Sequence, residues 1–109
     1  MQTQTARVSV SMGGNGMLCS IHGDIDHHNA RVIRMQIDDE LYRQRPKKLT
    51  LDLSKVEFMD SSGLGLILGR FNKASELGTE FTLLNPAESV RKILDVAGIA
   101  RMIKIERKR

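Results

Sequence analysis

The chain has 109 residues and a mass of 12.2 kDa, which is the size of one domain. Hydrophobic residues make up 40% and charged residues 28%, a globular balance that argues against a disordered or fibrous protein. No apolar run is long enough to span a membrane, and the start MQTQTARVSV lacks the order of a signal peptide. The single cysteine, Cys19, excludes an internal disulfide and suits a reducing compartment, so we expect a small cytoplasmic protein.

Most of the net positive charge lies at the C-terminal end. Lys and Arg number 17 against 13 Asp and Glu, so the net charge is +4, and it falls to +1 without the basic tail Arg107–Arg109. No aromatic residues are interleaved with the basic ones to stack nucleic-acid bases. We therefore predict a solvated tail and no direct contact with nucleic acid.

The first two predicted strands, Arg7–Ser11 and Met17–Gly23, alternate apolar and polar residues on either side of a glycine-rich turn at 13–16. This pattern predicts an antiparallel hairpin. Cys19 lies on the apolar side of the second strand, so we predict that it is buried and serves packing rather than redox chemistry.

A polar loop, Asp24–Asn29, leads into a predicted helix. The apolar residues at helical spacing on its face are Ala30, Ile33, Ile37 and Leu41. Leu49–Leu53 then alternates as a strand, and a second amphipathic helix follows and ends at Gly78, a residue type common at helix C-termini. The predicted apolar face of this second helix comprises Leu64, Ile67, Leu68 and Phe71.

The residue pattern in the last part of the chain predicts a strand at Phe81–Leu84, a third helix and a short final strand at Met102–Glu106. Asn85, Pro86 and Glu88 suit an N-cap, the first helical position and the third, respectively. The expected apolar face and closing glycine of this helix are Val90, Ile93, Leu94, Ala97 and Gly98.

Strands that alternate with helices favour parallel pairing, because each helix makes a right-handed crossover between neighbouring strands. The N-terminal hairpin adds an antiparallel pair. We therefore predict a single α/β domain with a mixed, mostly parallel β-sheet, an N-terminal antiparallel hairpin and three or more helices.

The segment Phe58–Arg70 joins the carboxyl end of a predicted strand to the N-terminus of a predicted helix. In parallel sheets this edge is where ligands and partners bind, and a helix N-terminus offers unpaired N–H groups and the positive end of the helix dipole. Asp60, Ser61 and Ser62 lie at the helix start, where they suit either plain capping or, for a serine, phosphorylation. The glycines of the segment match a dinucleotide-binding fingerprint only approximately, so nucleotide binding is the weaker interpretation.

The segment His22–His28 contains three histidines and two aspartates, residue types that bind metals. Adjacent loop residues cannot all point at one ion, so we favour capping of the next helix by Asp26 or a neighbour over a metal site. If the flanking strands are parallel, this loop shares one edge of the sheet with Asp60 and Ser61.

Ser61, His27 and Asp26 are the residue types of a hydrolase triad. The chain lacks a G-x-S-x-G elbow and an obvious oxyanion loop, and a chain of 109 residues leaves little depth for a substrate pocket. We therefore predict that the protein is not an enzyme and has no catalytic residues and no cofactor.

Two motifs, Gly23–Ala30 and Met59–Arg70, resemble those of the anti-sigma factor antagonists, whose fold is the STAS domain (sulfate transporter and anti-sigma factor antagonist). The resemblance is greatest to the sporulation type, the anti-sigma F factor antagonists, although Asp24 stands where that type often has glutamate. The order of predicted elements agrees over residues 7–106. We therefore expect a single STAS domain over residues 1–109, with 107–109 as a basic tail.

The resemblance implies a phosphorylation switch at Ser61, the serine directly after the motif aspartate. In the family, the anti-sigma factor is a serine kinase that phosphorylates this residue with ATP, and a serine phosphatase removes the phosphate. The unphosphorylated antagonist binds the anti-sigma factor and releases the sigma factor, and phosphorylation ends this binding. The implied roles for this chain are those of a kinase substrate and partner switch, without metal, membrane or catalysis of its own.

The residues around Ser61 are then expected to bind the partner, with Asp26 and His27 docking the kinase and Asp60 orienting the Ser61 hydroxyl. The full set of predicted partner-binding residues is Asp24, Asp26, His27, Met59, Asp60, Ser62, Gly63 and Leu64. An alternative function is a STAS scaffold module in a larger signalling assembly, since fold alone does not determine function. The intact run from Asp60 to Gly63 favours the switch.

Overall fold

The computed structural model describes residues 7–14 and 16–108, so residues 1–6, Asn15 of the predicted turn and Arg109 of the predicted tail lie outside the described residues. The described elements are β1 (Arg7–Gly13), β2 (Gly16–His22), α1 (Ala30–Gln44), β3 (Lys48–Lys55), α2 (Ser61–Glu76), β4 (Glu80–Leu84), α3 (Glu88–Val96), a 3₁₀ turn (Ile99–Arg101) and β5 (Lys104–Glu106). No helix formed by these residues is long and apolar enough to cross a membrane.

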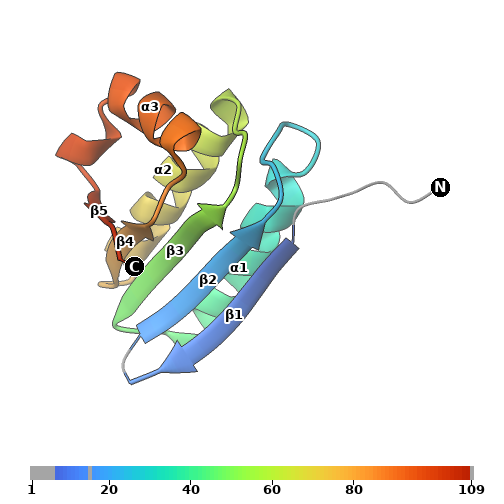
Figure 1. The fold of residues 1–109 in the computed structure, drawn as a ribbon. Helices are drawn as coiled ribbons and strands as arrows, with labels where there is room; N and C mark the ends of the chain where they lie inside the picture. The colour runs from blue at the N-terminus through green and yellow to red at the C-terminus, as the bar shows by residue number, and fades with distance from the viewer. Residues whose placement is uncertain (1–6, 15, 109) are drawn as a thin grey trace.

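The strands form one mixed sheet in the order β1, β2, β3, β4, β5 (Figure 1). β1 and β2 pair antiparallel, whereas β2 to β5 run parallel to one another. Cys19 of β2 lies beside Leu51 of β3, which lies beside Leu83 of β4. The predicted fold class is confirmed, and the carboxyl ends of β2 and β3 meet at one edge of the sheet.

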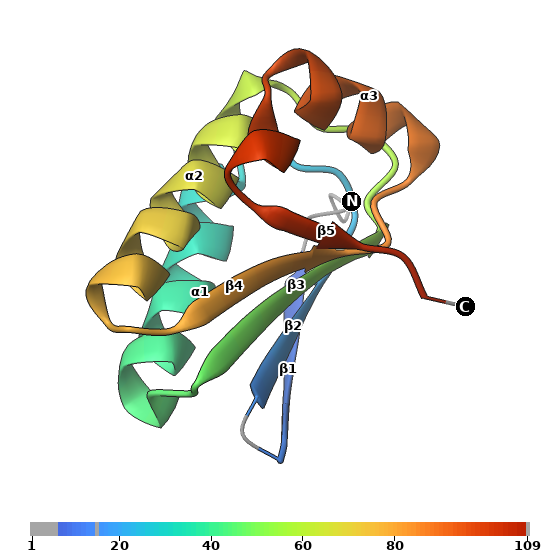
Figure 2. The ribbon, with the colours of Figure 1, turned by 90° about the vertical axis from the view of Figure 1, so that its left-hand side faces the viewer.

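Helices α1 and α2 cover one face of the sheet, and α3 lies across the carboxyl ends of the strands (Figure 2). Since alternate side chains of a strand point to opposite faces, β2 and β3 direct their apolar residues toward these helices. The buried apolar strand residues are Met17, Cys19, Ile21, Leu49, Leu51, Leu53, Phe81 and Leu83. Ile33, Ile37 and Leu41 of α1 are fully buried as well, as their spacing predicted. Removal of these side chains from water is the main contribution to stability.

The buried face of α2 contains the predicted Ile67, but its centre is shifted from the predicted one. Leu64, Leu68 and Phe71 are only partly buried, whereas Arg70, a charged residue, is 4% exposed. Nε of Arg70 lies 2.8 Å from Oδ1 of Asp38 on α1. This ion pair lets a guanidinium occupy a buried position between the two helices, which apolar periodicity alone does not predict.

The third helix begins later than its capping signal predicted. Asn85 is not its N-cap, because α3 begins at Glu88 after Ala87. Asn85 instead adopts a left-handed conformation at φ 51°, where its N–H donates to the carbonyl of Glu106 (2.8 Å) and its Oδ1 accepts from the N–H of Lys108 (2.7 Å). Asn85 thus holds the chain beyond β5. The predicted apolar-face residue Ala97 is exposed, since the helix ends at Val96.

We expect the thiol of Cys19 to resist modification in the folded protein. Its side chain is fully buried, and this burial, together with the charge of Glu40, raises the pKa of Cys19 to about 12, so the reactive thiolate is scarce at neutral pH. Reaction with Ellman's reagent is expected to be negligible in native buffer and to reach one thiol per chain in concentrated guanidinium chloride. Rapid labelling of the native protein would contradict this packing.

Candidate functional site

Backbone hydrogen bonds join the loops that follow β2 and β3. The N–H of Ile25 donates to the carbonyl of Phe58 (3.0 Å), and the N–H of Asp60 donates to the carbonyl of Ile25 (3.1 Å). Ile25 and Met59 are both buried at this bridge. The structure therefore brings together the two motifs found in the sequence, and we call residues 23–29 and 56–62 the rim.

Asp60 is the N-cap of α2. Its Oδ1 accepts a hydrogen bond from the N–H of Ser62 at 2.8 Å, and its Oδ2 lies 3.9 Å from Nδ1 of His27. Desolvation alone would raise the pKa of the Asp60 carboxyl, but the interactions with Ser62 and His27 outweigh it and hold this pKa below its usual value. The capping role predicted for this position is confirmed for Asp60. The next residue, Ser61, is left exposed at the start of the helix.

Gly63 lets the first turn of α2 pack directly on Met59. A Cβ atom added at Gly63 would overlap Cγ and Sδ of Met59, whose side chain is 1% exposed. Gly65 differs, because a Cβ atom added there would meet no heavy atom within 4 Å. Only Gly63 is therefore required by the packing of α2 beneath the rim.

The carboxylates of Asp24 and Asp26 accept hydrogen bonds from backbone N–H groups of the rim. Oδ1 of Asp24 accepts a hydrogen bond from the N–H of Phe58 at 3.1 Å, which adds a second link between the loops. Oδ1 of Asp26 accepts from the N–H groups of His28 (2.9 Å) and Asn29 (3.1 Å). The N-cap of α1 is Asn29, whose side chain makes no capping bond, so Asp26 forms the turn before the helix rather than its cap.

The exposed surface of the rim differs in part from the predicted partner-binding set. Among that set, Asp24 and His27 are exposed, Asp26, Asp60, Ser62 and Leu64 are partly buried, and Met59 and Gly63 are buried. Met59 is buried, and the backbone of Gly63 packs directly on it, so both residues support the rim; their part in partner binding stays a prediction. Met59 lies in a loop, where buried positions follow no sequence period, so its burial was not predictable.

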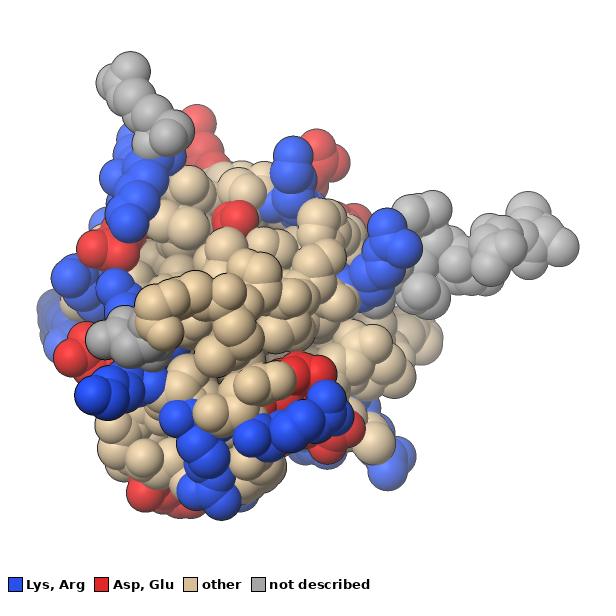
Figure 3. Space-filling model, turned by 90° about the horizontal axis from the view of Figure 1, so that it is seen from below, with Lys and Arg blue, Asp and Glu red and all other residues tan. Residues whose placement is uncertain are grey.

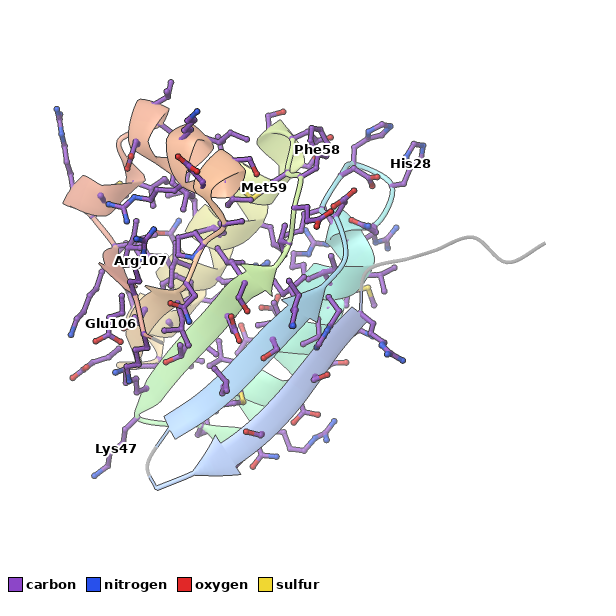
Figure 4. The ribbon with its side chains drawn as sticks, viewed as in Figure 1. His28, Lys47, Phe58, Met59, Glu106 and Arg107 are labelled. Carbon is purple, nitrogen blue, oxygen red and sulfur yellow. The ribbon has the colours of Figure 1, made fainter. Side chains whose placement is uncertain are left out.

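Phe58 is an exposed rim residue absent from the predicted set. Its side chain is 54% exposed, and Figure 4 shows it at the same end of the molecule as His28, with Lys47 at the opposite end. The only sequence signal was an aromatic residue outside the periods of the flanking strand and helix. An exposed aromatic ring on the same segment of the rim as Ser61 is a feature typical of protein interfaces.

The histidines and aspartates of the segment His22–His28 do not gather around one point. Nε2 of His22 lies 3.2 Å from Oγ of Ser9, and His27 lies beside Asp60. Among residues 7–14 and 16–108, no group of three or more His, Cys, Asp or Glu side chains is placed to hold a metal ion.

Basic side chains do not form one patch on the face opposite the rim. There, Lys and Arg are interspersed with Asp and Glu around a largely uncharged centre (Figure 3). Arg107 and Lys108, the described part of the predicted tail, are exposed. The side chains Asp24, Asp26 and Asp60 lie at the rim instead, so the candidate site is distinct from the basic tail.

The sequence of the chain was compared with models of known protein families. A family model described as the STAS domain matches residues 7–109. The chain belongs to the STAS domain family. The match includes both loops of the rim and all the elements of the sheet.

Relatives of this STAS domain include proteins named as anti-sigma factor antagonists. The anti-sigma F factor antagonist of Paenibacillus polymyxa is 34% identical over 89 residues, which cover 82% of this chain and 76% of the relative. The solved structure of the anti-sigma factor antagonist SpoIIAA in its unphosphorylated form has a TM-score of 0.80 and 26% identity, over 94% of this chain and 89% of that one. The Bacillus cell fate determinant SpoIIAA in the phosphorylated form has a TM-score of 0.74 and 25% identity, over 94% and 92% of the two chains.

We expect Gly63→Ala to lower the free energy of unfolding of this STAS domain by about 1–3 kcal/mol, because the new methyl group would displace the buried Met59. The matched control is Gly65→Ala, which adds the same methyl group in open space and is expected to raise stability by up to about 1 kcal/mol. Urea unfolding followed by circular dichroism measures both. Equal effects of the two substitutions would contradict the packing assigned to Gly63.

Acidification should remove the stabilisation that the Asp60 carboxylate provides. A carboxyl whose folded pKa is depressed stabilises the fold above its unfolded pKa, about 3.9 for aspartate, and this contribution is lost as pH falls through the folded pKa. Asp60→Asn keeps a capping side chain without the titration. The melting temperatures of the unsubstituted protein and of Asp60→Asn are therefore expected to converge as pH falls from neutral to values below the pKa of Asp60. A constant difference across this range would show that the charge of Asp60 contributes nothing.

Proposed function

We propose that this STAS domain is an anti-sigma factor antagonist that binds its anti-sigma factor while unphosphorylated and thereby releases the sigma factor. The observation that carries the proposal is Ser61, exposed directly after the helix-capping Asp60 on the rim. The names of the relatives support it, as do solved SpoIIAA structures in unphosphorylated and phosphorylated forms. The anti-sigma factor would be a serine kinase, and a serine phosphatase would reset the switch.

In the proposed modification, the γ-phosphoryl group of the kinase's ATP passes to Oγ of Ser61, whose proton is lost as ADP leaves. No hydrogen bond to the Ser61 hydroxyl forms within the described residues, so the group is free to enter a kinase active site. The carboxylate of Asp60 is already bonded to the N–H of Ser62 and thereby orients the start of the helix. Ser62 is partly buried, which makes it the poorer acceptor.

A phosphate on Ser61 would add a charge of about −1.5 to −2 at neutral pH. The N-terminus of α2 would stabilise it by about 0.3–1 kcal/mol, while the nearby carboxylate of Asp60 would oppose it. The two effects oppose each other inside the domain, so we expect little change of fold. The partner would meet the new charge directly, and a loss of only 1.4 kcal/mol weakens binding tenfold.

The docking surface we propose lies on the exposed part of the rim and extends to Leu64 in the first turn of α2. It consists of Asp24, His27, Phe58 and Ser61, with the partly buried Asp26, Asp60, Ser62 and Leu64 beside them. Phe58 would contribute apolar contact area, and the carboxylates would contribute charge. The protein would act in the cytoplasm, where ATP and a reduced Cys19 coexist, without catalysis of its own and without direct contact with nucleic acid or membrane.

Phosphorylation is expected at Ser61 alone when the protein is incubated with its cognate anti-sigma factor and ATP and the product is mapped by mass spectrometry. Ser61→Ala should abolish incorporation, and Ser62→Ala, a substitution of the same type at the next residue, should retain it. Ser61→Asp should weaken binding of the anti-sigma factor by about tenfold or more while the circular dichroism spectrum stays unchanged.

Three outcomes would contradict the proposal. These are phosphate on Ser62, no phosphate on either serine, and full binding by the Ser61→Asp variant. Co-purification with a large multiprotein assembly in place of a small kinase would instead indicate the STAS scaffold function.

A further inference from the structure

The two edge strands of the sheet differ in length and charge. β5 has only three residues, two of which are the charged Lys104 and Glu106. β1 has seven residues, carries a single charge at Arg7, and pairs with β2 without a bulge from end to end. Short length, charge and bulges keep edge strands from pairing with other chains, and beyond Arg7 the outermost strand β1 has none of these features (Figure 1).

The outer edge of β1 presents backbone groups at regular intervals. Gly13 pairs with Gly16 across a turn of two residues, and a pair that closes such a turn is a hydrogen-bonded one. Hydrogen-bonded and non-bonded pairs alternate along an antiparallel ladder, so Met12, Val10 and Val8 direct their N–H and C=O groups away from β2. Within the described residues β1 pairs with β2 alone, so these groups are open to a strand of another chain.

Exposed apolar side chains lie beside this edge. Val8, Val10 and Met12 lie opposite buried residues of β2, so their side chains point to the face of the sheet that α1 covers. Val10 and Met12 are nevertheless 36% and 46% exposed, and Val8 and Val10 line a groove of about 230 Å³ between β1 and α1. Val32 of α1 is 52% exposed and lies one turn before Gln36, which lines the same groove. α1 therefore leaves part of the apolar face of β1 uncovered.

The sequence of β1 is complementary to itself when two copies run antiparallel. Val10 is the middle residue of the strand, so a twofold axis at this position sets residues with outward N–H and C=O groups opposite one another, as hydrogen bonding between the copies requires. Apolar residues then face apolar residues, serine faces serine, and the single charge faces a glycine, so no like charges are opposed. The pairs in this register are Val10 with Val10, Val8 with Met12, Ser9 with Ser11 and Arg7 with Gly13.

We propose that two copies of this chain associate through β1 into a symmetric dimer, with one continuous sheet that joins both copies. A second copy fits this edge because self-pairing satisfies the outward backbone groups of both strands at once. The Val8, Val10 and Met12 side chains of both copies would form one apolar stripe beside the α1 helices, which adds burial to the backbone bonds. None of these residues belongs to the rim, so the dimer does not depend on the proposed kinase switch.

Sedimentation velocity of the full chain tests the dimer, and we expect the 12.2 kDa monomer to give way to a species of twice that mass as the concentration rises. Val10→Lys sets two like charges side by side on the twofold axis and is expected to weaken the dimer at least about tenfold. Val96→Lys, the same substitution at a 90% exposed valine of α3, should leave the dimer unchanged. Circular dichroism shows whether each variant is folded. A monomer at every concentration up to about 1 mM, or equal effects of the two substitutions, would overturn the proposal.

Cysteine cross-linking tests the register of the two strands. In the proposed dimer, Ser9 of one copy and Ser11 of the other form a non-hydrogen-bonded pair with Cα atoms about 4.5 Å apart, within reach of a disulfide. Both serines are exposed, whereas the native Cys19 is buried and does not compete. An equimolar mixture of Ser9→Cys and Ser11→Cys chains is therefore expected to form disulfide-linked dimers several-fold faster under mild oxidation than either variant alone, because neither residue lies opposite its own copy. Equal rates in the mixture and in the single variants would overturn the twofold pairing through β1.

Discussion

The backbone bonds that join Ile25 to Phe58 and Asp60 are the constraint on which the rim depends. They continue the parallel pairing of β2 and β3 beyond the end of the sheet, so two loops far apart in the chain share one register. Met59 is buried at this bridge, and Asp60 is placed to cap α2. The exposure of Ser61 follows from this series of contacts and is not a property of the serine itself.

The glycines of α2 have two different physical roles. Gly63 faces Met59 and lets the helix approach the rim, so its lack of a side chain is a packing requirement. Gly65 and Gly69 face open space beside α1, so their lack of a side chain shapes a groove. One run of glycines in the sequence therefore serves both the packing beneath the exposed serine and the groove between α1 and α2. The approximate dinucleotide fingerprint describes neither role.

Local patterns in the sequence predicted most of the fold but only part of the site. Alternation and helical spacing found the strands and helices, because each element has one buried face. The prediction for Asn85 was wrong, since a long-range bond to the chain after β5 outweighed its capping preference. Burial of Arg70 depends on Asp38 of another helix, and the exposure of Phe58 depends on a loop conformation without a period. Such features arise from tertiary contacts that no local pattern contains.

The N-terminus of α2 separates two regions of opposite charge. The carboxylates of Asp24, Asp26 and Asp60 lie on the rim, while Arg31 and Arg34 line the groove between α1 and α2. Ser61 lies on the rim, and the next residue, Ser62, lines the groove. A phosphate on Ser61 would thus be repelled on one side and attracted on the other within the same domain, which limits its effect on the fold. The free energy of the proposed switch would then arise mainly where the phosphate meets the partner.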